Sequence, residues 1–167
     1  MPIIRHKKGQ HTSSPLNLCL DFNAKKTEST WTFTESCKYN HNNADQGDWN
    51  KLTGIAFNLL NARANSIMCG WRYNVDTNLF ELCAYYHVNS SFNPPAQALI
   101  SVEVNEPFII EFSFDKNQKT ATMKVTYKGL TVSDTKPFEK FGINRPINTW
   151  FGGNLPTPHD MFFLKNI

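Results

Sequence analysis

Apolar and polar residues alternate along several segments of this 167-residue chain. In FIIEFSF (residues 108–114), every second residue is Phe or Ile, and the residues between them include Glu111 and Ser113. TATMKVTY (120–127) resumes the alternation after a polar turn, and LTVSD (130–134) follows a second turn. A period of two is typical of a β-strand, in which successive side chains point to opposite faces. These segments therefore predict a three-stranded antiparallel meander.

The same pattern predicts a hairpin further upstream. SIMCGWRY (66–73) and LFELCAYYHV (79–88) flank the polar link NVDTN (74–78), whose residues suit a turn. Shorter runs of strand-forming residues predict six more strands, at Leu16–Phe22, Trp31–Tyr39, Leu52–Leu59, Ala98–Val104, Thr149–Phe151 and Met161–Lys165.

Helix signals are weak throughout the chain. The best helical candidate, residues 52–64, contains Thr53, Gly54 and asparagines, which suit strands and turns better than helices. About ten short strands without a convincing helix predict an all-β fold. The expected architecture is a two-sheet antiparallel sandwich of the jelly-roll or concanavalin-like type.

The length of the chain predicts one domain. Arg5, Lys7 and Lys8 make residues 1–15 a basic N-terminal arm, and residues 16–167 form the single β-sandwich domain. The net charge of +3 is too small to indicate a nucleic-acid partner. We therefore expect the arm to be solvated or to contact a neighbouring subunit.

The chain shows no targeting or membrane signal. Residues 1–10 contain no apolar core of a signal peptide, and no run of 18 apolar residues occurs. The sequence thus predicts no membrane span and synthesis in the cytoplasm, and it leaves the final setting open, a virion included. The cysteines at 19, 37, 69 and 83 lack the C-x-x-C pairing of a zinc site. We expect buried thiols, and a disulfide between Cys69 and Cys83 stays open.

The predicted hairpin is unusually rich in aromatic residues. Trp71 and Tyr73 share one face of its first strand, and Tyr85 and His87 share one face of its second. Sugar rings stack on flat amphipathic side chains of this kind, and Arg72 between them can bond hydroxyl groups. The hairpin therefore predicts a ligand-binding face, with packing of these rings in the sandwich core as the alternative.

A polar loop precedes the strand predicted at residue 52. In NNADQGDWNKLTG (42–54), Asp45, Asp48 and Asn50 offer oxygen atoms, the ligands that calcium prefers. The spacing differs from an EF-hand loop, because no glutamate stands at the last position of such a loop. The segment predicts either a calcium site or a solvated loop with Asx-turns.

The segment FGGNLPTPHD (151–160) precedes the final apolar run. Its glycines permit unusual backbone angles, and its prolines stiffen the loop and donate no backbone hydrogen bond. The segment predicts a shaped corner that leads into a closing core strand. The alternative is a loop that lines a ligand site, with His159 and Asp160 as polar contacts.

Motifs for catalysis are scarce. A glycosidase needs two carboxylates that face each other, whereas Glu103 and Glu106 are three residues apart and fall on opposite faces of a strand. The chain contains no G-x-S-x-G, no H-E-x-x-H and no phosphate-binding glycine loop. Tyr85 and His87 form the one nearby couple of the kind that a polysaccharide lyase requires. We therefore expect a protein that is not an enzyme.

Four segments carry a resemblance to known proteins: GWRYN (70–74), ELCAYYHVN (81–89), FGGNLPTPHD (151–160) and DWNKL (48–52). They resemble a group of poorly characterised lectin-like or jelly-roll β-sandwich proteins of bacteria and their phages. The likeness spans roughly residues 45–167, and its most specific part is the FGG…PHD segment. It implies a concanavalin-like or jelly-roll sandwich and no established reaction.

Together these features predict a non-enzymatic β-sandwich for surface recognition. Its most concrete form is carbohydrate binding through the aromatic sheet face. One alternative is a structural or assembly subunit, such as a phage virion or surface-layer component, with neighbouring subunits or copies of itself as partners. The other is a carbohydrate-active enzyme, either a lyase or a hydrolase.

Overall fold

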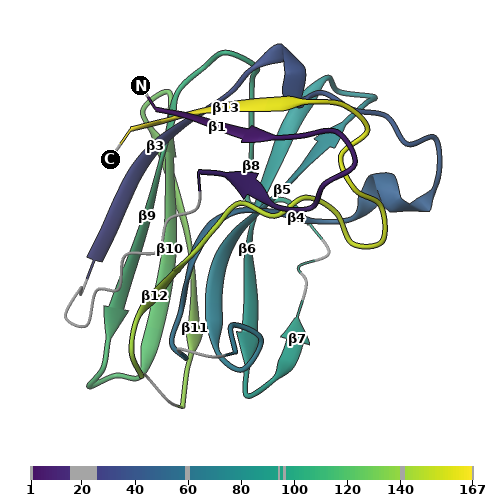
Figure 1. Ribbon diagram of the computed structural model, residues 1–167. Coiled ribbons are helices and arrows are strands. Elements are labelled where there is room, and N and C mark those ends of the chain that lie inside the picture. The colour runs from purple at the N-terminus through teal and green to yellow at the C-terminus, as the bar shows by residue number, and fades with distance from the viewer. Residues whose placement is uncertain are drawn as a thin grey trace.

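Two antiparallel β-sheets form this protein, as the computed structural model shows (Figure 1). The structure describes residues 2–15, 26–58, 61–93, 95, 97–139 and 142–166. In spatial order, the strands of sheet A are β11 (Leu130–Pro137), β10 (Thr120–Tyr127), β9 (Phe108–Asp115), β3 (Lys26–Phe33), β13 (Met161–Asn166), β1 (Ile3–His6) and β2 (Ser13–Ser14). Those of sheet B are β12 (Arg145–Ile147), β4 (Asn50–Ala56), β5 (Ser66–Asn74), β6 (Leu79–Val88) and β7 (Ser91–Asn93), and β8 (Ile100–Val102) also pairs with β6.

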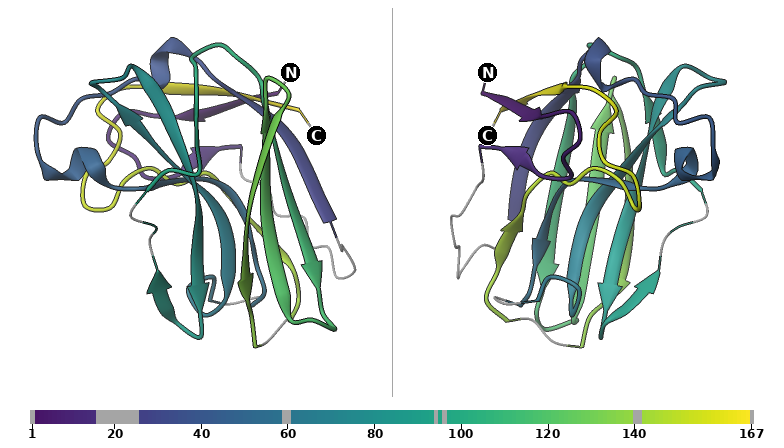
Figure 2. Two further views of the ribbon diagram at one scale, coloured as in Figure 1. Left: turned by 180° about the vertical axis from the view of Figure 1, so that it is seen from behind. Right: turned by 45° about the vertical axis from the view of Figure 1, so that its right-hand side comes forward.

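The two sheets lie in separate layers. Viewed from behind, β5 and β6 stand in one layer and β9, β10 and β11 in the other (Figure 2). The helical content of the described chain is limited to two short 3-10 turns, η1 (Glu35–Cys37) and η2 (Ala44–Gly47). Within these same residues, no helix has the length and apolar character needed to cross a membrane. The predicted all-β, two-sheet antiparallel sandwich is therefore confirmed.

Alternation located the longest strands closely. The segments 66–73, 79–88, 108–114 and 120–127 coincide with β5, β6, β9 and β10 to within one residue. These strands pair with their neighbours along nearly their whole length. Their side chains therefore lie in turn on the buried and the outer face of the sheet, and this alternation gives the sequence its period of two.

Several shorter strands differ from the prediction. The strand expected over Trp31–Tyr39 ends at Phe33, where η1 follows, and Tyr39 reaches the core from a loop. Thr149–Phe151 forms only isolated bridges, and β8 covers three residues of its predicted segment. The segment Leu16–Phe22 lies outside the described residues. The apolar residues in these places indicate burial correctly. In a short segment, however, the sequence of a buried loop cannot be distinguished from that of a buried strand.

Residues 3–6, assigned above to a basic arm, form strand β1 inside sheet A. β1 pairs with β13 of the same chain along its whole length. His6 is fully buried and Ile4 packs against the core, whereas Arg5 is exposed and forms an ion pair with Asp160. Residues 3–6 are thus an amphipathic strand of the sandwich, although their basic character suggested a solvated arm. The predicted boundary at residue 15 therefore does not separate an arm from the sandwich. The two chain ends lie side by side as a result (Figure 1).

Phe33 joins the two sheets at the centre of the core. From β3 in sheet A, its ring stacks on Phe80 of β6 at 4.2 Å and lies 5.0 Å from Trp71 of β5. It also contacts Phe108 and Phe163 of its own sheet, with ring centroids 5.3 and 5.8 Å away. All five side chains are at most 1% exposed. Since burial of one such side chain stabilises a fold by about 1.5–3 kcal/mol, this cluster is a main source of adhesion between the sheets.

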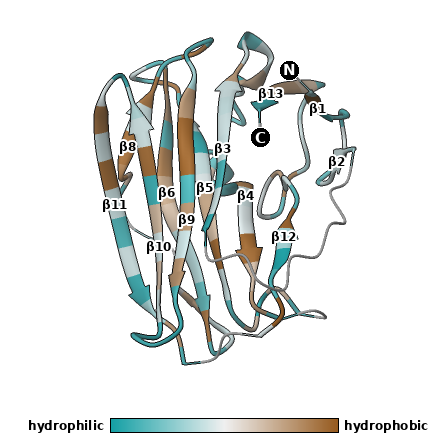
Figure 3. Ribbon diagram, turned by 90° about the vertical axis from the view of Figure 1, so that its left-hand side faces the viewer, coloured by the Kyte–Doolittle hydropathy of each residue, from teal (hydrophilic) through white to brown (hydrophobic). Residues whose placement is uncertain are grey.

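The outer face of sheet A is polar. Glu111 on β9 forms ion pairs with Lys26 on β3 at 2.6 Å and with Lys124 on β10 at 3.1 Å. At the edge of the sheet, the hydrophobic bands of β11 lie near its start and hydrophilic ones follow (Figure 3). The residues of β11 are exposed or half-buried along the whole strand, as is typical of a solvated edge strand.

His6 predicts that the fold loses stability in mild acid. Its ring packs edge-on against Phe163 at 5.6 Å, and neither ring nitrogen has a hydrogen-bond partner among the described residues. Burial lowers the pKa of His6 from 6.5 to about 4. Between these values the unfolded chain binds the proton more readily, so the stabilising contribution of neutral His6 is full above pH 6.5 and is lost as the pH falls toward 4.

The expected loss in the free energy of unfolding is up to about 3 kcal/mol, at about 1.4 kcal/mol per unit of pKa shift. Urea unfolding at neutral pH and at about pH 4.5 measures it. The variant His6→Leu should lack this component of the pH dependence. An unchanged dependence in His6→Leu would show that other groups cause the acid sensitivity.

Candidate functional site

The β5–β6 hairpin divides its aromatic residues between the two faces of sheet B. In the observed register, Trp71 and Tyr73 point toward sheet A, whereas Arg72, Tyr85 and His87 lie on the outer face. Trp71 is fully buried and Tyr73 is 9% exposed. The expected single binding face made by these residues is therefore wrong. Alternation relates residues within one strand, and only the pairing register relates two strands to each other.

A groove of about 790 Å³ lies on the outer face of sheet B and is named here the sheet B groove. Met68, Tyr85 and His87 of the hairpin line it together with Lys51 of β4. Its other lining residues come from segments 62–63, 90–92 and 145–153, and Thr12 adds to them from the N-terminal segment. The volume falls in the range of about 300–1,000 Å³ that is typical of small-molecule sites.

Two aromatic side chains of the sheet B groove are exposed. Trp150 is 42% exposed and Phe92 is 50% exposed. The Trp150 ring stacks on His11 at 5.3 Å, and Phe92 lies 4.9 Å from the Tyr85 ring. The backbone of Trp150 exchanges two hydrogen bonds of 2.8 Å with Lys51. The groove therefore presents flat apolar surfaces on positions that the backbone holds in place.

Sequence reasoning did not single out Trp150, Phe92, Arg63 or Arg145. For Trp150 a signal was present, because a tryptophan two residues before a Gly-Gly pair stands where a regular strand is about to end. The other three residues stand in segments without a clear alternating pattern. They become neighbours of the hairpin only through the fold.

Three cationic side chains, Lys51, Arg63 and Arg145, line the sheet B groove. The Lys51 ammonium donates a hydrogen bond to the Trp49 carbonyl at 2.9 Å and lies 4.6 Å from the centre of the Tyr85 ring. Burial lowers the pKa of Lys51. The groove thus holds positive charge that is partly removed from water.

His87 is the titratable group of the groove that changes charge nearest to neutral pH. Burial lowers its pKa, and the positive charges of Lys51 and Arg63 lower it further. Its Nδ1 lies 3.1 Å from the Ser66 hydroxyl. His87 is therefore neutral at pH 7 and able both to donate and to accept a hydrogen bond.

Asn50 holds the loop that carries Trp150. It is 1% exposed, its side-chain oxygen accepts a hydrogen bond from the Gly152 N–H, and its amide donates to the Tyr39 hydroxyl at 3.0 Å. Gly152 has a φ of +83°, a left-handed conformation that favours glycine. Gly152 adopts this conformation and Gly153 approaches Asp48 closely, so both glycines fit the corner predicted from the sequence.

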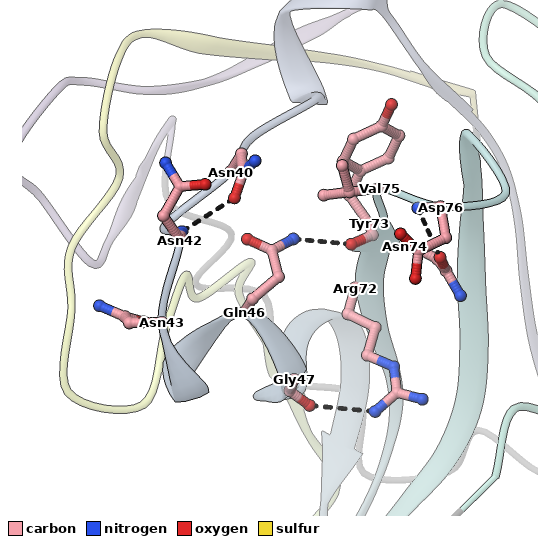
Figure 4. Close-up of a pocket in the computed structure, with 10 residues that line it drawn as sticks. All are labelled: Asn40, Asn42, Asn43, Gln46, Gly47, Arg72, Tyr73, Asn74, Val75 and Asp76. Atoms are coloured by element: carbon pink, nitrogen blue, oxygen red, sulfur yellow. Dashed lines mark hydrogen bonds between the residues drawn. The ribbon is translucent and has the colours of Figure 1, made fainter.

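A second, smaller pocket of about 420 Å³ lies between the η2 loop and the end of β5 (Figure 4). Its polar groups already bond one another. The Gln46 amide donates to the Tyr73 carbonyl at 2.8 Å, and Arg72 donates to the Gly47 carbonyl at 3.1 Å and to Glu81 at 2.6 Å. Arg72, expected to contact a ligand, is held in this network. We therefore assign the candidate site to the sheet B groove.

The residues predicted to bind calcium all have protein partners. Asn50 bonds the Gly152 backbone, Asp48 lies against Gly153, and Asp45 accepts a hydrogen bond from Asn154 at 3.4 Å. In the part of the chain that the structure describes, no group of three or more His, Cys, Asp or Glu side chains is placed to hold a metal ion. Calcium binding at these residues stays a prediction.

His159 and Asp160 lie beside η1 and β1, and neither lines the sheet B groove. His159 Nε2 is 2.9 Å from the Ser36 carbonyl oxygen. The Asp160 carboxylate accepts hydrogen bonds from the Lys8 N–H and the Arg5 guanidinium, and these bonds lower its pKa. Both side chains therefore fasten other segments to the final strand.

Cys69 and Cys83 point to opposite faces of sheet B. Cys69 belongs to the main core, and Cys83 packs in a small outer cluster with Trp49 and Tyr85. Both thiols are buried and free, as is that of Cys37. The disulfide left open by the sequence is therefore absent. Residue 19 lies outside the described residues.

Solved structures with a similar fold include lectins and a carbohydrate-binding module. Winged bean acidic lectin complexed with methyl-α-D-galactose aligns with a TM-score of 0.49 and 8% identity, over 91% of this chain and 74% of that chain. The module CBM66 from Bacillus subtilis aligns with a TM-score of 0.38 and 12% identity, over 94% and 85%. Lectin I from Ulex europaeus, complexed with the methyl glycoside of α-L-fucose, gives 0.35 and 9%, over 98% of both.

These likenesses concern the fold alone. No protein-family model matches the chain, and no curated protein matches it.

Replacing Asn50 by Ala should destabilise the protein through the loop of Trp150. The change leaves the buried Gly152 N–H without its partner, which costs about 1–3 kcal/mol. Urea unfolding measures the loss. The matched control is Asn154→Ala, an exposed asparagine of the same loop, which should change stability by less than about 0.5 kcal/mol. Equal effects of the two changes would contradict the role given to Asn50.

Proposed function

We propose that this protein is a non-enzymatic, carbohydrate-binding β-sandwich whose sugar site is the sheet B groove. The observation that carries the proposal is the presence of two exposed rings, Trp150 and Phe92, in one groove with Tyr85. Sugar rings have apolar C–H faces that stack on aromatic side chains. Their hydroxyl groups require polar partners around such a surface.

Polar side chains surround the exposed rings. The hydroxyls of Thr12 and Ser90 are exposed and line the groove, and Arg63 and Arg145 line it too. Trp150 is fixed by its backbone bonds to Lys51, so little conformational freedom is lost when a ligand stacks on it. The groove thus combines a prepared apolar platform with hydrogen-bonding groups at its margin.

Removing either exposed ring should weaken glycan binding. Trp150→Ala and Phe92→Ala should each reduce affinity by about thirtyfold, the effect of losing about 2 kcal/mol at a binding hot spot. Affinity electrophoresis against a panel of soluble polysaccharides, followed by calorimetry with those that bind, measures the change.

The control for this test is Phe162→Ala, since Phe162 is 37% exposed on β13 and does not line the groove. It should bind as the wild type does. Equal weakening by Phe162→Ala, or no binding of the wild type to any polysaccharide, would overturn the proposal.

A polysaccharide lyase is the second candidate function. Tyr85 and His87 lie 5.6 Å apart between ring centroids, and Arg63 and Arg145 line the same groove. In a lyase, neutral His87 would take a proton from the sugar and Tyr85 would donate one to the leaving oxygen. A hydrolase is less well supported, because none of the described residues that line the groove is a carboxylate.

We expect binding without turnover. Tyr85 is only 6% exposed, burial raises its pKa to about 12, and the Lys51 ammonium lies over its ring. Incubation with polyuronates should therefore give no rise in the ultraviolet absorbance of unsaturated products. A rise that persists in Phe162→Ala and disappears in His87→Ala would replace the binding proposal with a lyase.

The assembly hypothesis has less support. It placed the N-terminal residues on a neighbouring subunit, whereas β1 pairs with β13 of its own chain. A place in a phage virion or surface layer, association with copies of itself, and the resemblance to bacterial and phage proteins stay predictions.

A further inference from the structure

The cations that line the sheet B groove form no ion pair with a carboxylate of the described residues. Lys51, Arg63 and Arg145 line it, and none of the described residues that line it is Asp or Glu. The net charge of the whole chain is +3, so these three side chains equal the entire excess. Several cations elsewhere pair with acids, as Arg5 pairs with Asp160.

Each cation of the groove lacks an ion-pair partner among the described residues. Lys51 donates to a backbone carbonyl only. The Nε of Arg145 is buried and has no hydrogen-bond partner in the same residues. Arg63 is exposed, and its charge lowers the pKa of both Lys51 and His87. Lys51 and Arg63 therefore lie close enough to repel each other.

Two carboxylates lie nearby, and neither lines the groove. Asp48 favours the charged form of Lys51, but its carboxylate lies against Gly153 and does not line the groove. Glu81 forms an ion pair with Arg72 at 2.6 Å and accepts a hydrogen bond from Asn74 at 2.8 Å. Neither carboxylate provides an anion at the groove surface.

We infer that the sheet B groove selects acidic glycans, polysaccharides whose sugar rings carry carboxylates as uronates do. The inference rests on the proposed carbohydrate-binding function. A uronate ring offers an apolar face to Trp150 or Phe92 and a carboxylate to the arginines. Arginine binds a carboxylate through two parallel N–H···O bonds, and two arginines, Arg63 and Arg145, line the groove.

Single-stranded nucleic acid also combines stacking bases with negative charge. Its backbone is normally followed by a continuous basic track, whereas Lys51, Arg63 and Arg145 lie in one groove of about 790 Å³. The outer face of sheet A is not such a track, because Lys26 and Lys124 pair with Glu111. Nucleic acid is therefore the less favoured occupant and is one outcome of the test.

The test compares matched ligands that differ only in charge. Calorimetry and affinity electrophoresis measure binding of the full chain to polygalacturonate and to its highly methyl-esterified form. Alginate, hyaluronate, dextran sulfate, neutral mannan and an oligothymidylate complete the set. At least one polyuronate should bind, and its methyl ester or the neutral polymer should bind more weakly by about tenfold or more, equivalent to about 1.4 kcal/mol.

Variants locate the charge effect in the groove. Arg63→Gln and Arg145→Gln should each weaken polyuronate binding by about tenfold and weaken neutral-glycan binding by less. The matched control Lys116→Gln removes one exposed cation from the β9–β10 turn and should bind as the wild type does. Thermal unfolding of each variant without ligand verifies that the fold is intact.

The outcomes separate the inference from the proposed function. If polygalacturonate and its methyl ester bind equally and Trp150→Ala weakens both, acidic selectivity is overturned and the proposed carbohydrate binding stands. Tight binding of dextran sulfate or oligothymidylate that is insensitive to Trp150→Ala would overturn both and indicate a general polyanion site. No binding to any polysaccharide would overturn both as well.

Discussion

The stacking of Phe33 on Phe80 and its contact with Trp71 are the interactions on which the rest of the structure depends. They join sheet A to sheet B and commit Trp71 to the core. Because side chains alternate along a strand, burying Trp71 sends its neighbours on β5 outward. The register with β6 then places Tyr85 and His87 on that same outer face. The pairing of β5 with β6 therefore determines both which side chains enter the core and which line the groove.

The walls of the groove depend on a second constraint, the closure of the segment that follows β12. The Trp150 backbone is bridged to β4, and Asn50 binds Gly152 from beneath the loop. A buried backbone N–H needs a partner, and Asn50 supplies it without a regular strand. The loop can therefore leave the sheet and still present a fixed ring. The ring proposed to stack on sugars, Trp150, therefore lies in a segment that contributes little to the sheets themselves, as is common for binding loops.

Sequence alternation located β5, β6, β9 and β10 because a period of two is a local property of one strand. It did not locate β1, in which Arg5 conceals the inward positions of Ile4 and His6. The binding face was predicted wrongly for a different reason, since grouping Trp71 with Tyr85 required the register between two strands. Trp150 and Arg63 enter the site from distant segments, and that proximity is a product of the fold. Strand content was thus predictable, whereas the groove was not.

Stacking and charge act differently on a bound sugar. Most sugars present an apolar face, so a ring such as Trp150 supplies affinity with little selectivity. In the proposed acidic-glycan site, a carboxylate bound to Arg63 or Arg145 would discriminate strongly, because a neutral sugar offers no anion to either guanidinium. Burial already lowers the pKa of Lys51, which shows that its charge has lost part of its solvation. Under the proposed selectivity, an anionic ligand would compensate this lost solvation and a neutral sugar would not, so the burial of Lys51 itself favours an acidic glycan.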